Sequence, residues 1–392
     1  MLALIIIILI LLTLFIGTTL FRSVGVEAEQ APHPNNMQEI ELEPEQEETE
    51  EETEEEIEEE SEEAEEDMEE EQDITTYWEE KAELVTSDDD TVTFVDALGH
   101  TKTLEKKPQR VVSLTPSPIG LWYEAGGKIV GRVHSPYDEF LPEEALEDEV
   151  EVIGNSWEIT SIRLESVMAT NPDLVILDKD KIIFAQPLAI VGIKTIIVDY
   201  ADIRDYLKWF KVFSLLNNEE ELYDNVAKQT LDYTLAVIER VPVVERPKVL
   251  CLNVDKTSIT ANLSNTMLGT IVNELGGINV AGNYADPENE EISKIEVTLE
   301  AMVESNPDKI LVHQFTDDGT VQTILEQIFE TNPILKTLNA VKNNEIYYLD
   351  MSLFACYPNK RYNEAYSEVL KMLYQTKEET IEEASEIVEA II

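Results

Sequence analysis

The sequence is poor in positive charge. Its 392 residues include 28 Lys and Arg against 82 Asp and Glu, which gives a formal net charge of −54. The stretch from Glu39 to Asp73 contributes 24 of these acids and contains no Lys or Arg. The rest of the chain still carries about −30 and shows no basic stripe. Nucleic-acid binding depends on Lys and Arg that neutralise phosphates. We therefore expect no nucleic-acid partner.

Cysteine is also scarce, since Cys251 and Cys356 are the two in the chain. Two cysteines cannot form a disulfide framework. Cys251 lies in the strand-like run 249–252 and is expected to behave as a small buried apolar residue. Whether it pairs with Cys356 is left open by the sequence.

Motifs typical of enzymes are missing as well. No Gly-x-Gly-x-x-Gly joins a strand to a helix, and no Gly-x-x-x-x-Gly-Lys-Ser/Thr loop occurs. Gly276, Gly277 and Gly282 have the wrong spacing and follow a helical pattern. No Ser/His/Asp set or HExxH-type metal motif stands out. We expect a protein that is not an enzyme and that holds no resident cofactor or metal ion.

Long apolar and acidic segments occupy the N-terminal quarter. Leu2 to Leu20 is almost wholly apolar and is long enough to span a bilayer. Residues 1–21 are therefore expected to be an uncleaved signal-anchor, with a cleaved signal peptide as the alternative. No Cys follows this run, which excludes a lipid attached to such a Cys in the chain as written. Flanking charge does not decide the orientation.

Acidic segments flank the region that is expected to be ordered. Residues 22–90 form a Glu-rich linker whose low hydrophobicity and high charge predict disorder, so that it acts as a tether. A surface that collects cations is the alternative. Tyr77 and Trp78 are expected only to dock the end of this linker. The acidic tail 376–392 has no assigned role.

One segment occurs twice, as Leu164–Ile176 and again as Leu299–Leu311. Each copy predicts a short helix, an Asn-Pro-Asp turn and a buried strand. Two copies so far apart favour two similar lobes over a solenoid. Strand-like and helical runs alternate on either side of the repeat, which predicts parallel sheets covered by helices. Residues 91–202 and 246–375 are predicted to form the lobes, and the first lobe begins with a β-hairpin around Gly99.

A helical region, 203–245, separates the two lobes. It is expected to break at Asn217-Asn218, with Asn218 as the N-cap of the second helix and Glu221 as its capping-box partner. The second helix has about 22 residues and spans about 33 Å, enough to reach both lobes.

Together these segments resemble a known family. The matching segments are Arg110–Ser117, Gly126–Arg132, both copies of the repeat, Leu275–Ala281 and Leu338–Tyr347. They resemble substrate-binding proteins of ABC importers for iron–siderophore complexes, haem and cobalamin. The resemblance covers about residues 91–375. It implies two Rossmann-like lobes joined by a long helix, with the ligand held between them.

The resemblance also implies partners and a location. It predicts a monomer at the extracytoplasmic face of the membrane that delivers a ferric siderophore to an ABC permease and its ATPase. Glu165 and Glu300 match the family positions that dock onto the permease, and two separated carboxylates suit orientation and steering. The alternative is that each complements a helix dipole. Cobalamin or haem as ligand, or a surface or sensor protein without transport, remain alternatives.

Candidate ligand-binding residues follow from the strands, because ligands bind beyond the carboxyl ends of parallel strands. Aromatic groups suit a large planar ligand, and Arg361 suits carboxylate or catecholate oxygens. His134 and His313 could ligate haem or metal, although a hydrogen-bonded structural role is the common alternative. The candidates are Ser117, His134, Tyr137, Trp157, Lys179, Tyr284, His313, Phe315, Tyr357 and Arg361.

Overall fold

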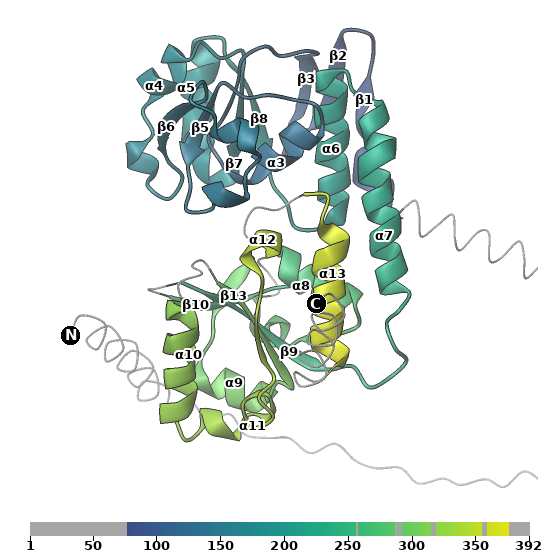
Figure 1. Ribbon diagram of the computed structural model, residues 1–392, viewed down its shortest axis with the longest axis vertical. Coiled ribbons are helices and arrows are strands. Elements are labelled where there is room, and N and C mark those ends of the chain that lie inside the picture. The colour runs from purple at the N-terminus through teal and green to yellow at the C-terminus, as the bar shows by residue number, and fades with distance from the viewer. Residues whose placement is uncertain are drawn as a thin grey trace, which may run out of the picture. The chain divides into compact units, whose positions relative to one another are not determined.

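The computed structural model describes residues 77–255, 258–286, 289, 292–314, 319–354 and 359–375 (Figure 1). The predicted signal-anchor, most of the linker and the acidic tail lie outside these residues. Within the described part of the chain, no helix combines the length and the apolar character needed to cross a bilayer.

Residues 77–90 form regular structure rather than disordered linker. A helical segment covers 77–83, and β1 (Thr86–Ser87) follows it. Trp78, Ala82 and Val85 are buried in the main hydrophobic core. Trp78 and Ala82 are four residues apart and so lie on one face of the helix, and Val85 follows its end. The expectation that Trp78 only docks the end of the linker was therefore wrong. The acidic composition of the preceding residues had placed this short apolar pattern in the predicted linker.

The predicted β-hairpin is confirmed. β2 (Thr91–Val95) pairs antiparallel with β3 (Thr101–Glu105), and β1 adds to the other edge of β2. Gly99 lies in the turn with φ of 78°, a backbone conformation that favours glycine. The hairpin packs on the helix α6 (Ile203–Asn217), so it is part of the folded body of the protein.

The first lobe contains a parallel five-stranded sheet in the order β6-β5-β4-β7-β8, as predicted. Its strands are β4 (Val111–Ser113), β5 (Gly131–His134), β6 (Glu151–Asn155), β7 (Leu174–Asp178) and β8 (Lys194–Val198). The helices around it are α3 (Ser117–Glu124), α4 (Leu164–Ala169) and α5 (Ala185–Ile190). The chain builds outward from β4 in both directions. The point between β4 and β7 is therefore a topological switch point, where ligands bind in such sheets.

The second lobe contains a mixed sheet in the order β12-β10-β9-β13-β14, with β11 pairing with β9. Its strands are β9 (Lys248–Val254), β10 (Ile259–Asn262), β11 (Ile278–Asn279), β12 (Lys294–Glu296), β13 (Lys309–Gln314) and β14 (Ile346–Tyr348). β9, β11, β13 and β14 are parallel, but β10 runs antiparallel to β9 and β12. The prediction of a parallel sheet was wrong at β10. Only Asp255 to Ser258 separates β9 from β10, and so short a connection can join only antiparallel strands.

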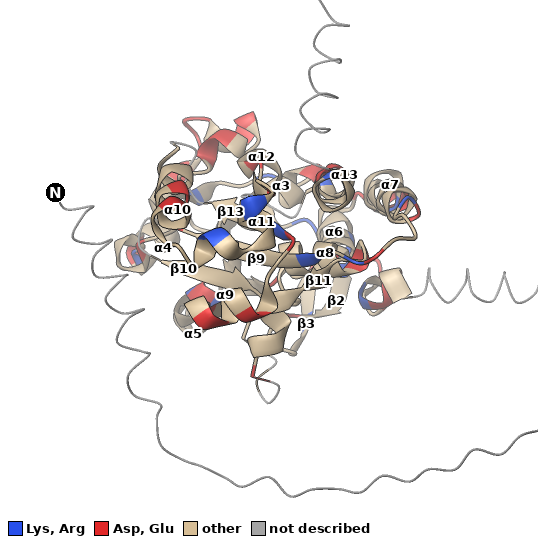
Figure 2. Ribbon diagram, turned by 90° about the horizontal axis from the view of Figure 1, so that it is seen from below, with Lys and Arg blue, Asp and Glu red and all other residues tan. Residues whose placement is uncertain are grey.

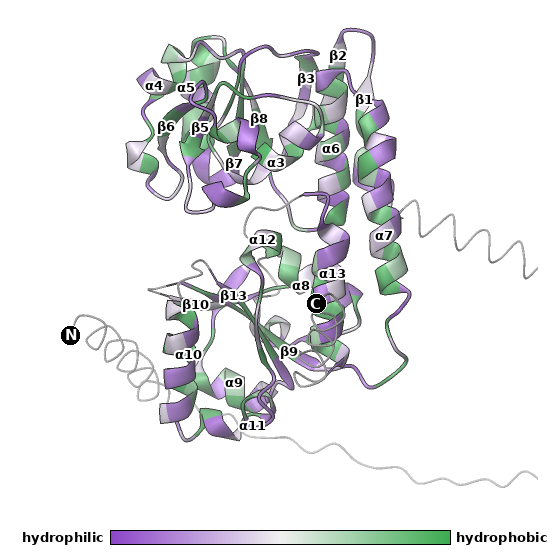
Figure 3. Ribbon diagram, viewed as in Figure 1, coloured by the Kyte–Doolittle hydropathy of each residue, from purple (hydrophilic) through white to green (hydrophobic). Residues whose placement is uncertain are grey.

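Helices cover the second sheet. They are α8 (Met267–Glu274), α9 (Leu299–Ser305), α10 (Thr320–Thr331), α11 (Asn339–Lys342), α12 (Met351–Phe354) and α13 (Tyr362–Tyr374). In both lobes the strands are mostly hydrophobic while the outer helices alternate in character (Figure 3). The strands of each lobe supply many of its buried apolar side chains.

A helical spine runs along one side of both lobes (Figure 1). α6 (Ile203–Asn217) is followed by a π-helical turn (Tyr223–Lys228) and α7 (Gln229–Ile238). The π-helical turn packs on α6, and α7 packs on α13. The predicted break is present, but Asn218 terminates α6 in a left-handed conformation with φ of 60°. The prediction that Asn218 is the N-cap of the second helix was therefore wrong. Asn is one of the few residues that readily adopt the left-handed conformation found at helix C-termini.

The repeated segment folds the same way twice, as predicted. α4 and α9 each precede an Asn-Pro-Asp turn in which the Asn has positive φ, at Asn171 and Asn306. Asp173 then accepts from the backbone N–H of Arg110 at 3.0 Å, and Asp308 accepts from that of Lys248 at 3.0 Å. Both acceptors anchor the start of the neighbouring strand, β4 or β9. The repeat thus encodes equivalent corners of the two lobes.

Candidate functional site between the lobes

A cavity of about 650 Å³ lies between the two lobes. From the first lobe it is lined by residues that follow β4, β5, β6 and β7, which places it at the switch point of that sheet. From the second lobe it is lined by the end of β10, the start of α8, β12, β13 and α12. Each lobe therefore contributes one wall.

Two aromatic side chains form part of the first-lobe wall. Tyr137 and Trp157 meet edge to face with ring centroids 5.8 Å apart. Tyr137 is 5% exposed, whereas Trp157 is 57% exposed. The backbone N–H of Trp157 donates to Asn155 Oδ1 at 2.9 Å, which fixes the turn after β6. An indole held by such a turn offers a flat apolar surface to a ligand.

The second-lobe wall combines three apolar side chains with four polar ones, Asn262, Thr266, Lys294 and His313. Thr266 caps α8 by accepting from the backbone N–H of Gly269 at 3.2 Å, and Met267 and Leu268 follow it into the cavity lining. His313 lies on β13 and hydrogen-bonds with the backbone of Phe354. Burial, followed by the charge of Lys294, lowers the pKa of His313 to about 4. Its imidazole is therefore neutral at pH 7.

A second cavity of about 940 Å³ adjoins the first. The two share the lining residues Thr115, Ser117, Asp178, Asp180, Thr266 and Lys294. The second cavity adds the segment after β8, including Asp199 and Tyr200. Burial raises the pKa of the Tyr200 hydroxyl, which is therefore neutral. The two spaces form one continuous cleft that is wide enough for a ligand larger than an amino acid.

The predicted ligand residues divide into three groups. Ser117, Tyr137, Trp157 and His313 line the first cavity, and Lys179 lines the second. Three others line neither cavity: His134, Tyr284 and Arg361. Phe315 and Tyr357 lie outside the described residues.

Local partners explain the positions of those three side chains. His134 Nδ1 lies 2.6 Å from Asp138 Oδ2 on the first lobe. The Tyr284 hydroxyl donates to the carbonyl of Ala301 at 3.1 Å, inside the second lobe. Arg361 makes two bonds to Glu364 Oε2, at 2.7 and 3.0 Å, within the first turn of α13.

Several lining residues were not among the candidates. Asp178 ends β7, and Asp180 and Lys181 come directly after it, so the rule that selected Lys179 could have selected them too. Thr266 carries a helix N-cap signal. Asn262 and Lys294 had no signal, because they belong to β10 and β12, the antiparallel addition that the sequence reasoning missed.

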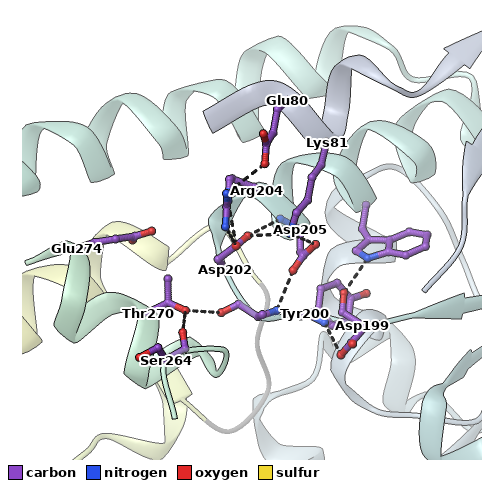
Figure 4. Close-up of polar contacts among 12 residues, drawn as sticks. Glu80, Lys81, Asp199, Tyr200, Asp202, Arg204, Asp205, Ser264, Thr270 and Glu274 are labelled. Carbon is purple, nitrogen blue, oxygen red and sulfur yellow. Dashed lines mark hydrogen bonds and ion pairs between the residues drawn. The ribbon is translucent and has the colours of Figure 1, made fainter. Parts of the chain in front are cut away.

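A polar network links residues of the first lobe, the spine and the second lobe (Figure 4). Asp202 caps α6 and accepts from Arg204 Nη2 at 2.5 Å, and Lys81 Nζ donates to Asp205 at 2.7 Å. Burial raises the pKa of the Asp202 carboxyl, but Arg204 and Lys81 lower it overall. Burial and the charge of Asp202 raise that of Asp205. Thr270 of α8 donates to the carbonyl of Ala201 at 3.4 Å, which ties the second lobe to this network.

Two further carboxyl groups lie where the lobes meet the spine. Glu124 of α3 accepts from the backbone N–H of Lys360 at 3.1 Å, and Glu274 of α8 accepts from the Tyr366 hydroxyl. Burial raises the pKa of each carboxyl to about 7. Glu124 belongs to the first lobe and Lys360 to the segment before α13, so this bond crosses between the lobes.

The fold and the cleft define a class of protein: two α/β lobes on a helical spine that hold a ligand between them. The chain belongs to the periplasmic binding protein family, which matches residues 111–353. This match confirms the family predicted from the sequence.

Individual relatives agree with this assignment. The chain is 24% identical over 269 residues to an uncharacterised ABC transporter substrate-binding lipoprotein, YvrC, of Bacillus subtilis, covering 67% of this chain and 79% of that protein. It also resembles an ABC transporter substrate-binding protein from Listeria monocytogenes, with TM-score 0.58 and 24% identity over 69% of this chain and 99% of that one. S. aureus IsdE, solved with heme, gives TM-score 0.58 and 22% identity, covering 68% and 99%. At these identities the structural likeness establishes the fold.

The site also bears on the expectation of no catalysis. The relatives named as substrate-binding proteins are binding proteins rather than enzymes, which supports a role without catalysis. In the part of the chain that the structure describes, no three His, Cys, Asp or Glu side chains are grouped to hold a metal ion. Cys251 is a free, buried thiol in β9, and Cys356 lies outside the described residues.

Proposed function

We propose that this chain is an extracytoplasmic solute-binding protein that delivers a ferric siderophore complex to an ABC importer. The observation that carries the proposal is the cleft, in which Tyr137 and Trp157 of one lobe face Met267, Leu268 and Phe354 of the other. Ligand pockets combine such apolar walls with a few placed polar groups. The names of the relatives support the link to ABC transport.

Haem is the second candidate, and His313 is the reason. A neutral imidazole that lines a cavity can ligate haem iron, and the low pKa of His313 keeps it neutral at physiological pH. The structurally similar IsdE was solved with heme. A His313→Ala variant that retains full haem affinity would exclude this ligand role.

Tryptophan fluorescence tests the proposal directly. Three of the four tryptophans, Trp78, Trp122 and Trp209, are at most 7% exposed, whereas Trp157 is largely exposed and lines the cavity. A ligand in the cleft should therefore quench mainly Trp157. We expect a ferric siderophore to quench the wild type with submicromolar affinity and to leave Trp157→Phe nearly unquenched.

Controls separate this result from its alternatives. Haem and cobalamin should be titrated in parallel. Titration of free tryptophan with each coloured ligand measures the loss of signal that comes from light absorption alone. Native mass spectrometry should give one ligand per chain. No binding by any of these compounds would contradict the proposed transport role and favour a surface or sensor protein.

We further propose that Glu165 and Glu300 dock the loaded protein onto the permease. Each lies in the first turn of its helix, α4 or α9, and each side chain is exposed. Within the described residues neither carboxylate forms an ion pair, so both are available to permease arginines. Charges of this kind set orientation and association rate more than affinity.

Uptake and binding must be measured separately to test docking. Glu165→Ala with Glu300→Ala should abolish uptake in cells while leaving the cleft's ligand affinity unchanged. A matched control removes two exposed acids of the spine, Glu221 and Asp232. Normal uptake by the first double variant, or equal loss in the control, would refute docking through this pair.

The apolar segment 1–21 is proposed to hold the lobes at the extracytoplasmic surface, with the acidic linker as a tether. Membrane fractions of cells that express the full chain should contain the intact protein. Release of a shortened soluble form, with a new N-terminus after residue 21, would instead establish cleavage.

A further inference from the structure

Resting on the proposed function, we infer that the cleft selects solutes with little or no net negative charge. The geometry points to neutral or cationic ferric chelates, such as trihydroxamates, rather than trianionic tricatecholates. The observation is that each cation lining the two cavities in the described residues either forms an ion pair with an aspartate or shares both cavities with one. These cations are Lys179, Lys181 and Lys294, and no Arg lines either cavity there.

Lys181 is neutralised by its own segment. Its side chain is buried, and Nζ lies 3.3 Å from Asp178 Oδ2. Asp178 also accepts from the backbone N–H of Lys181 at 3.0 Å. The carboxylate therefore caps the helical turn and holds the ammonium group at the same time. A buried charge fixed in this way is poorly available to a ligand.

Lys179 also has an acidic partner from the first lobe. Its Nζ forms an ion pair with Asp199, which follows β8. Both side chains are about half exposed and line the second cavity, so a ligand entering that cavity would meet the pair. An incoming anion would have to compete with Asp199 and would meet its charge as a repulsion.

Lys294 is the cation that the second lobe contributes to the lining. Asp180 and Lys294 line both cavities, one from each lobe, so an aspartate and a lysine share the same space. Burial lowers the pKa of the Lys294 ammonium group, while the charges of Asp180 and Asp255 raise it in part. The negative charge of Asp180 therefore acts in the space where an anion would approach Lys294.

Counting charges gives a neutral lining. Three aspartates, Asp178, Asp180 and Asp199, oppose the three lysines among the described lining residues. The stretches of the second lobe between the described ranges contain one Lys and five acids in sequence, so their net charge is negative. Arg361, the predicted catecholate grip, is engaged by Glu364 on α13 instead.

The surroundings act in the same direction. Outside the Glu-rich stretch the chain carries about −30, and acidic residues are spread over several elements of the ordered part (Figure 2). A trianion would be repelled at long range and would find no uncompensated cation on arrival. A neutral chelate can stack on Trp157 and accept hydrogen bonds from lysines that stay paired.

Ligands of graded charge test the inference with the full-length protein. We would titrate a cationic and a neutral ferric trihydroxamate, a ferric tricatecholate and cyanocobalamin at low and high salt. The trihydroxamates are expected to bind at least 100-fold more tightly than the tricatecholate at low salt. Added salt should narrow this difference by screening the repulsion.

A charge variant gives an independent readout. Asp180→Asn with Asp199→Asn exposes two lysine charges, and we expect tricatecholate affinity to rise about tenfold or more. The ratio of tricatecholate to neutral trihydroxamate affinity should rise by the same factor, and an unchanged ratio would contradict the charge rule. Asp232→Asn on α7 is the matched control outside the cleft, and thermal melting of each variant checks folding.

The outcomes separate the two proposals. Tricatecholate binding as tight as or tighter than trihydroxamate binding overturns the charge rule but leaves the transport role standing. If cyanocobalamin is the one probe that binds, the charge rule is supported and the proposed ligand changes from a ferric siderophore to cobalamin. Haem as the sole ligand, with its two carboxylates, also overturns the rule. No binding of any probe overturns both proposals.

Discussion

Replacing Glu124 by Gln should stabilise the protein at alkaline pH. Burial raises the pKa of this carboxyl from the ordinary 4.5 to about 7, while its Oε2 accepts from Lys360 across the lobes. A folded-state pKa above the unfolded one means that the folded state binds the proton more tightly. This contribution to stability is present in full below about pH 4.5 and is lost as pH rises to about 7.

The size of the effect follows from the shift. One pKa unit corresponds to about 1.4 kcal/mol, so a shift of this size changes the free energy of unfolding by up to about 3 kcal/mol. Gln retains a side-chain oxygen that can accept from the backbone N–H of Lys360, but it never ionises. At pH 8 we therefore expect Glu124→Gln to exceed the wild type by about 1–3 kcal/mol, and at pH 4.5 to match it.

Urea unfolding at several pH values between 4.5 and 8 measures this difference. Glu221→Gln, at an exposed position on the spine, is the control and should follow the wild type at every pH. Because Glu274 has a similar pKa, some pH dependence should persist in the variant. A Glu124→Gln protein that is less stable than the wild type at pH 8 would refute the assignment of a strained, buried carboxylate.

Three further outcomes follow from packing and capping. Gly127→Ala should destabilise the protein by about 1–3 kcal/mol in thermal melts, because a Cβ there would lie 2.2 Å from Nε1 of the fully buried Trp122. The control is Gly120→Ala, where a Cβ meets nothing within 4 Å; Gly99 is unsuitable as a control because its φ is positive. Asp173→Ala and Asp308→Ala should cost similar amounts, about 1–3 kcal/mol each, since both release backbone donors of a neighbouring strand; a large effect at only one site would deny the equivalence of the two corners. The Cys251 thiol is buried, which raises its pKa, so a thiol reagent should modify it only on unfolding; rapid labelling of Cys251 in the native protein, located by mass spectrometry, would contradict its place in β9.

The sequence predicted what local pattern and internal repetition control. The hairpin at Gly99, the helix–turn–strand repeat and the parallel first sheet all depend on short-range periodicity, and all three are present. The same reasoning failed at β10, where a four-residue connection reverses the chain, and at Trp78, where a buried helical face is embedded in acidic sequence. In each case the structure depends on a few residues, whereas the prediction relied on the average composition or pattern of the surrounding segment.

Site prediction was limited by geometry that no local pattern carries. The rule that ligands gather beyond strand ends led to Trp157 and His313, which do line the cavity. It could not foresee that β12 would bring Lys294 to the cleft. The pairing of Arg361 with Glu364, three residues later, was readable from the helical pattern but was not weighed against a ligand role. Side chains near a site are claimed first by local partners, and only the folded chain shows which remain for a ligand.

The two lobes are alike in one respect and different in another, and the difference concerns specificity. The repeat builds the same corner twice, and in each copy it carries the glutamate proposed to dock the permease. The cleft walls are not repeated: the first lobe contributes the Tyr137–Trp157 pair and three aspartates, whereas the antiparallel β10 and β12 bring Asn262 and Lys294 only to the second. A duplicated scaffold suits a partner that contacts both lobes, and unlike walls suit a single asymmetric ligand. Substitutions that exchange cleft residues should therefore change which solute binds without affecting docking, whereas substitutions in the repeat should do the reverse.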